Sequence, residues 1–206
     1  MGAGHPECPE RLDAIEDRLL MSGLDVALER REATAASMAD LELAHGRMHL
    51  ASLRGLSDNL RDEIKAGGPT HAQVDPDTSI NTHSWDAILM AAGAAIDATD
   101  AVMAGEMPNA FCAVRPPGHH ATRNQAMGFC FVNNVAVAAK YALERHGLKR
   151  VAIIDFDVHH GNGTEDIVAG DDRILMCSFY QHPFYPACEH STAANLVNLP
   201  VPAYTR

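Results

Sequence analysis

The chain has 206 residues, 47% of them hydrophobic, and a formal net charge of −11 at neutral pH. This length and hydrophobic content predict one globular domain over residues 1–206 and argue against disorder. The negative charge argues against direct nucleic-acid or anionic-membrane binding, which both need clustered positive charge, and no apolar stretch reaches the roughly 18 residues that span a bilayer.

The first half of the chain is predicted to be mainly helical, with helices over residues 9–23, 49–68 and 84–106. Each of these segments has a glycine at or next to its last residue, as helices commonly do. The third segment is the most apolar and is predicted to be deeply buried, with Ser84 as its N-cap and Gly105 at its end.

In the second half, extended and helical segments alternate. We predict strand 109–115, helix 133–147, strand 150–158, helical turn 164–170 and strand 173–180. The continuous apolar run in 150–158 is typical of a parallel strand covered on both faces. This alternation predicts a parallel sheet in an α/β fold, which places ligands at the carboxyl ends of its strands.

The cysteines indicate a reducing environment. There are five of them, scattered and never spaced as CxxC: Cys8, Cys112, Cys130, Cys177 and Cys188. This pattern predicts free thiols, and it argues against a disulfide framework or a cysteine zinc site. The first residues, "MGAGHPECPERL", show no basic segment followed by an apolar one, so we expect no signal peptide and a cytoplasmic location.

The segment "DFDVHHGNGT" (155–164) places acidic and imidazole side chains at the end of a predicted strand. Asp155, Asp157 and His159 alternate, so on an extended chain they point to one side. Asp157 and His159 can share one divalent ion, with zinc favoured, and the deeper Asp155 can fix a histidine or bind a monovalent cation. The alternative is a surface turn, but burying these groups unpaired would be costly.

The segment "RPPGHHA" (115–121) holds two adjacent histidines on a loop stiffened by prolines. Because imidazole titrates near neutrality, His119 and His120 can divide general-base and general-acid duties. The alternative is two loop histidines that are satisfied by ordinary hydrogen bonds. In "MGFCFVNN" (127–134), Phe129 and Phe131 are interpreted from composition alone as core residues, and Asn133 with Asn134 as a helix cap.

Five stretches resemble the zinc-dependent histone deacetylases and their bacterial amidohydrolase relatives, with a class II-like pattern. They occur in family order as "GHPECPERL", "RPPGHHA", "MGFCFVNNVAVAA", "VAIIDFDVHHGNGT" and "SFYQHPFYP". The resemblance implies an arginase/deacetylase-like three-layer α/β fold with a central parallel sheet, here incomplete at both ends. It also implies hydrolysis of an acyl amide, with an acetylated lysine peptide, an acetylpolyamine or another acylated amine as substrate.

The resemblance assigns roles to the polar residues. It makes Asp157 and His159 two of three zinc ligands, and His119 and His120 the proton-transfer pair. Asp155 matches the residue that orients the first of these histidines, and Asn162 the residue that orients the second. A structural potassium ion is implied at Asp155, Asp157, His159, Ser178 and Phe179.

The substrate contacts follow from the same resemblance. Phe129 and Tyr185 match the aromatic walls of an acyl-lysine tunnel, with Gly128 beside them. The rim carboxylate that holds the substrate backbone is matched, loosely, by Asp75 or Asp77.

Two parts of the family's catalytic set have no match in this sequence: the third zinc ligand, an aspartate, and the tyrosine that stabilises the oxyanion. We therefore expect the chain as given to be inactive or nearly so, whether it is a fragment or a natural truncation. The alternatives are a non-catalytic acyl-lysine or metal-binding module, and an interaction protein. An exposed sheet edge is expected to favour a homo-oligomer.

Overall fold

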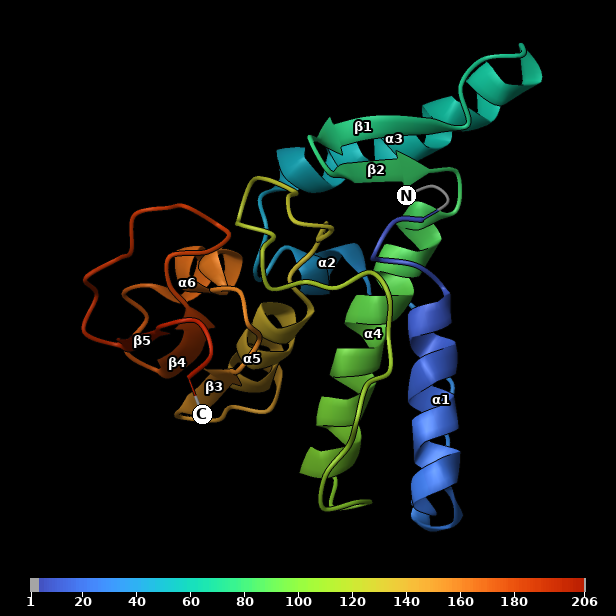
Figure 1. Ribbon diagram of the computed structural model, residues 1–206. Helices are drawn as coiled ribbons and strands as arrows, with labels where there is room; N and C mark the ends of the chain where they lie inside the picture. Colours follow the sequence, from blue (N-terminus) through green and yellow to red (C-terminus); the bar gives the residue numbers. More distant parts are fainter. Residues whose placement is uncertain (1–3, 206) are drawn as a thin grey trace.

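Helices and two small β-sheets make up the computed structural model, which describes residues 4–205 (Figure 1). The helices are α1 (Glu10–Ser22), the 3₁₀ turn η1 (Asp25–Ala27), α2 (Met38–Leu41), α3 (Arg47–Lys65), α4 (Ser84–Met103), α5 (Asn134–Arg145) and α6 (Asn162–Val168). The strands are β1 (His71–Asp75), β2 (Thr78–Asn81), β3 (Val151–Asp155), β4 (Ile174–Gln181) and β5 (Leu196–Val201).

The predicted helices are present close to their expected bounds. Gly23 ends α1 in the left-handed conformation at φ 73°, and the side chain of Asn133 caps α5 by accepting the N–H of Ala136. The prediction that Ser84 caps α4 is wrong: His83 is the N-cap residue, and Ser84 Oγ accepts the Asn81 N–H at 2.9 Å. No helix within residues 4–205 combines the length and apolar character that crossing a membrane requires.

One core runs from the helical half of the chain into the parallel sheet. Its members are apolar side chains with little or no exposure, among them Leu41, Leu50, Ile80, Ile88, Val137, Ile174 and Met176. The face that α4 buries includes Ile88, Ala92 and Ile96, as its apolar sequence predicts. The core thus fixes the helices against the sheet that carries the predicted site.

The predicted parallel sheet is formed by β3, β4 and β5, in that order. The register between β3 and β4 runs from Val151 opposite Ile174 to Asp155 opposite Ser178. Because the strands are parallel, their carboxyl ends meet at one edge, and Asp155 and Ser178 lie side by side there. This parallel sheet belongs to the α/β architecture that the sequence predicted.

Helices α5 and α6 pack on one face of this sheet (Figure 1). On the opposite face, side chains stay exposed: Ile154 is 62% exposed, while its neighbour Ile153 is 5% exposed and points into the core. The expectation that both faces of 150–158 are covered is therefore wrong for the residues described. Two layers of the expected three are present at this sheet.

The prediction of a strand over residues 109–115 is also wrong. This segment has no strand assignment, and Phe111 within it is 70% exposed. A strand requires a hydrogen-bonding neighbour, and between residues 4 and 205 no neighbouring strand pairs with this segment. Conversely, β5 and the antiparallel pair β1–β2 are additions that the sequence pattern did not indicate.

Candidate active site

The two histidine-bearing segments meet at the carboxyl end of β3. His119 Nδ1 lies 2.9 Å from Asp155 Oδ2, and His120 Nδ1 lies 2.8 Å from Asn162 Oδ1. The centres of the two imidazole rings are 4.0 Å apart. The first turn of α6 fixes this arrangement, because the N–H groups of Gly163 and Thr164 both donate to the carbonyl oxygen of His119.

The pairs His119–Asp155 and His120–Asn162 differ in the charge that their side chains carry. Burial, reinforced by the neighbouring His119 ring, lowers the pKa of His120 to about 4, so its imidazole is neutral at neutral pH. With Nδ1–H donating to Asn162, the Nε2 lone pair of His120 is free to accept a proton. Burial opposes ionisation of Asp155, but contact with His119 outweighs it and holds the pKa of Asp155 below its ordinary value. Asp155 is thus a carboxylate that can stabilise a protonated His119.

Asp157 and His159 lie at the exposed end of the same strand. Asp157 Oδ1 accepts the His159 N–H at 2.7 Å and lies 3.0 Å from His159 Nδ1. Two ligand atoms of a tetrahedral zinc ion are about 3.3 Å apart when each bond is about 2.0–2.1 Å. A carboxylate oxygen and an imidazole nitrogen at this separation fit one zinc ion with only a slight change.

Aromatic side chains from the loop after β4 surround this pair. The ring of Phe184 stacks on His159 with centres 4.9 Å apart and planes 8° apart. Tyr185 stands edge-on to His120 at 5.0 Å. Burial, with smaller effects of Asp77 and Asp75, raises the pKa of Tyr185 to about 12, so its hydroxyl stays protonated. The predicted tunnel residue Tyr185 therefore borders both histidine segments.

Gly128 and Phe129 sit in left-handed backbone conformations, with φ of 56° and 69°. A Cβ atom at Gly128 would lie 2.6 Å from His120 Cδ2, so glycine is needed for the chain to approach this ring. Phe129 is half-buried with its ring edge-on to His5 at 4.6 Å, whereas Phe131 belongs to the core.

The predicted rim carboxylates lie where β1 turns into β2, with Asp75 as the last residue of β1 and Asp77 in the turn. The Asp77 N–H donates to Asp75 Oδ1 at 2.9 Å, and hydrogen bonds from Asp77 and Thr78 outweigh burial to lower the pKa of Asp75. Burial and the adjacent Asp75 raise the pKa of Asp77. The two carboxyl groups thus differ in acidity, and both lie near enough to influence Tyr185.

Two residues of the expected potassium site lie side by side on β3 and β4, and Phe179 follows on β4 with its side chain exposed. Asp155 and Ser178 are cross-strand partners, and Ser178 is fully buried. The Gln181 N–H donates to the carbonyl oxygen of Val158, which holds the Asp157–His159 segment against β4. Oxygen donors that include backbone carbonyls suit a hard cation, so the set is chemically consistent with potassium.

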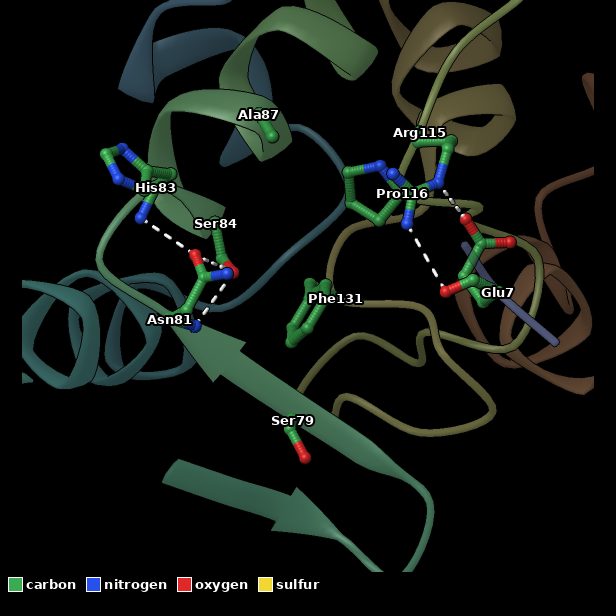
Figure 2. A pocket seen from close by; sticks show the side chains of 9 residues that line it. All are labelled: Glu7, Ser79, Asn81, His83, Ser84, Ala87, Arg115, Pro116 and Phe131. Atoms are coloured by element: carbon green, nitrogen blue, oxygen red, sulfur yellow. Dashed lines mark hydrogen bonds and ion pairs between the residues drawn. The ribbon is translucent and has the colours of Figure 1, made fainter. Parts of the chain in front are cut away.

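Sequence reasoning missed the structural importance of Glu7. Its side chain is 4% exposed and forms ion pairs with Arg115 Nε at 2.5 Å and Arg11 Nη1 at 2.6 Å. This contact anchors the first segment to the start of the "RPPGHHA" loop. Glu7 and Arg115 also line a cavity of about 220 Å³ beside Asn81 and Phe131, and Figure 2 shows that its labelled lining residues include none of the predicted site residues.

Comparison with known proteins places these features in a family. The model of the histone deacetylase domain matches residues 5–206. A histone deacetylase-like amidohydrolase from Pseudomonas aeruginosa is 44% identical over 184 residues, which cover 89% of this chain and 46% of that protein. The polyamine deacetylase HDAC10 of Mus musculus is 39% identical over 91% of this chain and 28% of its own length.

A solved structure gives the same result. The HDA15 HD domain superimposes with a TM-score of 0.85 and 34% sequence identity, covering 97% of this chain and 57% of the solved chain. The chain spans about half the length of the amidohydrolase and less of HDAC10.

Proposed function

Because the chain belongs to the histone deacetylase family, we propose that it forms the zinc-binding and proton-transfer part of an enzyme that hydrolyses acyl amides on lysine or a related amine. The observation that carries this proposal is the pair of side-by-side contacts His119–Asp155 and His120–Asn162, next to Asp157 and His159. Two oriented imidazoles beside a potential metal site are suited to hydrolysis rather than to simple binding.

The residues of this chain divide the proton transfers. Neutral His120, held by Asn162, accepts a proton from the attacking water through Nε2. His119, whose charged form Asp155 stabilises, is placed to protonate the leaving amine. Zinc held by Asp157 and His159 would supply Lewis-acid polarisation of the substrate carbonyl and a lower pKa for the attacking water.

We infer the substrate class from the residues around the histidine pair and from the names of similar proteins. We assign Tyr185, Phe129 and Gly128 to a narrow aromatic passage for an acyl-amine chain, with Asp75 or Asp77 at its rim. Relatives named as a histone deacetylase-like amidohydrolase and a polyamine deacetylase support acetylated lysine or an acetylated polyamine as the substrate. We assign potassium to the Asp155–Ser178 region in a structural role.

We further propose that residues 4–205 alone hydrolyse acyl amides only slowly. Asp157 and His159 supply two ligands, and within the described part of the chain no third histidine, cysteine or carboxylate joins them. Loss of an oxyanion donor alone costs a rate factor of roughly 100 to 1,000. The five cysteines, which form no disulfide within the described chain, support action in a reducing compartment such as the cytoplasm.

Zinc-dependent binding of a hydroxamate inhibitor tests the metal site directly. Calorimetry of the purified chain with excess Zn²⁺ should show binding that His159→Ala abolishes and that His182→Ala, in the loop after β4, leaves intact. Binding that survives His159→Ala, or no binding by the wild type, would contradict the assigned zinc ligands.

Turnover separates hydrolysis from the non-catalytic alternative. With excess Zn²⁺, we expect slow release of acetate from an acetyl-lysine peptide or an acetylpolyamine, and a further loss of about 100-fold or more in His120→Ala. Inhibitor binding with no turnover of either substrate would favour a binding module instead. If the chain shows neither inhibitor binding nor turnover, the remaining alternative is an interaction protein.

A further inference from the structure

A second group of possible metal ligands lies behind the candidate active site. His160, Glu165 and His190 each offer one ligand atom, and these atoms all lie within 4.8 Å of one another. His160 follows β3, Glu165 belongs to α6, and His190 comes from the loop between β4 and β5. No sequence pattern indicates this set, because His190 is separated from the others by about 25 residues or more and belongs to no regular motif.

In each of the two imidazoles, one ring nitrogen lies beside a hydroxyl group. His160 Nδ1 lies 3.1 Å from Ser178 Oγ, and His190 Nε2 lies 3.2 Å from the Tyr180 hydroxyl. When these nitrogens donate to the hydroxyl oxygens, His160 Nε2 and His190 Nδ1 keep free lone pairs. A hydrogen bond on the other ring nitrogen is also how metal-bound histidines are usually oriented.

Both of the remaining nitrogens are buried without a hydrogen-bond partner among residues 4–205. The side chain of His160 is 1% exposed, so water does not readily compensate its Nε2 atom. The two rings are perpendicular, with centres 4.6 Å apart. Leaving a buried polar nitrogen unpaired costs about 1–3 kcal/mol. A shared ion would remove this cost at His190 and would replace the 3.2 Å contact between His160 Nε2 and Glu165.

Glu165 supplies the negative charge. Its Oε1 accepts the Ser191 N–H at 2.6 Å, and its Oε2 accepts the Asn198 amide at 2.6 Å. Oε2 also lies 3.2 Å from His160 Nε2, in a geometry that does not make a hydrogen bond. A carboxylate oxygen has two lone pairs, so Oε2 retains one for a further partner.

We propose that His160 Nε2, Glu165 Oε2 and His190 Nδ1 form a second metal site, distinct from Asp157–His159, that binds a divalent transition ion, with Zn²⁺ preferred. Two imidazoles and one carboxylate are a known zinc ligand set, and nitrogen donors disfavour K⁺, Mg²⁺ and Ca²⁺. Partly exposed His190 provides the route by which the ion enters.

The ion would attach the loop between β4 and β5 to α6 and to the end of β3. This loop also carries Phe184 and Tyr185, which contact His159 and His120. The second site therefore has a structural role: it holds the aromatic side chains over the histidine pair. The inference does not depend on the proposed hydrolysis, since every atom that carries it lies outside the assigned catalytic zinc ligands.

Metal binding by the full chain in a His159→Ala background tests the proposal, because this background removes the first site. After treatment with a chelator, titration with Co²⁺ should show one equivalent bound, with visible absorption typical of nitrogen and oxygen ligands. Adding His190→Ala should weaken binding at least about 10-fold. The matched control is His182→Ala, which removes a ring 6.4 Å from His190 in the same loop and should leave the affinity unchanged.

Hydrogen exchange in the loop between β4 and β5 provides a second measurement. Circular dichroism checks that each variant is folded, and Glu165→Gln removes the ligand charge while keeping the side-chain size. In the wild type, Zn²⁺ should slow hydrogen exchange over residues 182–195, and it should do so in His159→Ala but not in His190→Ala. No binding in the His159→Ala background, or equal affinities of the His190→Ala and His182→Ala variants, would overturn the second site.

Discussion

Two glycines in the left-handed region show how a single residue positions the histidine pair. Gly128 (φ 56°) and Gly105 (φ 73°) both avoid the cost that a side chain pays in this conformation. A Cβ at Gly105 would meet no atom within 4 Å, whereas one at Gly128 would meet the His120 ring at 2.6 Å and the Tyr185 hydroxyl at 3.0 Å. Close packing therefore adds to backbone strain only at Gly128.

Comparing alanine at these two positions measures that packing. Gly105→Ala should cost about 1–2 kcal/mol in the free energy of unfolding, the penalty of the left-handed conformation. Gly128→Ala should cost about 1–3 kcal/mol more, because His120 and Tyr185 must move. Urea denaturation gives both values, and equal costs would show that the chain relaxes around position 128 without strain.

The buried side chain of His45 should make the free energy of unfolding depend on pH. Its Nε2 accepts the N–H of Asn133 at 2.9 Å, and burial, with a smaller effect of His49, lowers its pKa to about 4. Between pH 6.5 and about 4 the unfolded chain binds a proton at this position and the folded chain does not. Stability is therefore fully present above pH 6.5 and falls as the pH is lowered through this window.

The contribution of His45 can be isolated with His45→Gln, whose side-chain oxygen can still accept the Asn133 N–H. The wild type should lose up to about 1.4 kcal/mol per pH unit more than the variant within the window, and about 3 kcal/mol in all. Unfolding free energies measured from pH 4 to 8 test this. The two curves should run parallel above pH 7, and parallel curves at every pH would show that His45 does not carry the effect.

At the scale of elements, Asn133 joins the start of α5 to its surroundings. Its side chain caps the helix at the Ala136 N–H, and its amide also donates to the carbonyl oxygen of Ala121 and to Thr164 Oγ1. Asn133 is fully buried. In addition to capping the start of α5, Asn133 therefore connects this helix to the 115–121 segment and to α6.

Asn133→Ala should consequently cost more than the loss of an ordinary cap. We expect about 2–4 kcal/mol, because buried partners lose their hydrogen bonds in addition to the cap itself. Ser37→Ala is the control: Ser37 caps the short, exposed start of α2 at the Asp40 N–H and should cost about 0.5–1 kcal/mol. Similar losses in the two variants by chemical denaturation would contradict the linking role of Asn133.

The elements that sequence predicted correctly are those whose signals are local. Apolar periodicity and terminal glycines gave α1 and α4, and the β-branched run gave β3. Residues 109–115 looked like a strand, but strand formation depends on a neighbour that the local sequence does not specify. β5 shows the converse, because Pro200 and Asn198 weaken its pattern and pairing with β4 creates the strand.

The same distinction applies to the candidate site. The resemblance paired His119 with Asp155 and His120 with Asn162, and the structure places each pair within 2.9 Å. Glu7 and His190 escaped notice because the contacts that matter, Glu7 with Arg115 and His190 with His160 and Glu165, join residues far apart along the chain, and only the fold brings them together. Local motifs therefore indicated the chemistry, but not the contacts that position it.

At the scale of the whole molecule, the uncovered face of the parallel sheet presents adjacent exposed apolar side chains. The register places Ile154, Cys177 and Val197 in one row across β3, β4 and β5, and Phe179 beside Leu199 in another. Ile154, Phe179, Val197 and Leu199 are 39–62% exposed. Contiguous apolar surface of this kind promotes association in water, since its burial contributes roughly 25 cal/mol per Å².

We therefore predict that the 22.2 kDa chain self-associates through this face. Sedimentation velocity over increasing protein concentration should show species larger than the monomer. Ile154→Lys should shift the distribution toward the monomer by placing a charge at the β3 end of the row, where the apolar side chain is most exposed. Val26→Lys makes the same chemical change at a 92% exposed residue of η1, away from the sheet, and should have no effect. A wild type that stays monomeric at every concentration, or equal shifts in the two variants, would show that the face does not drive association.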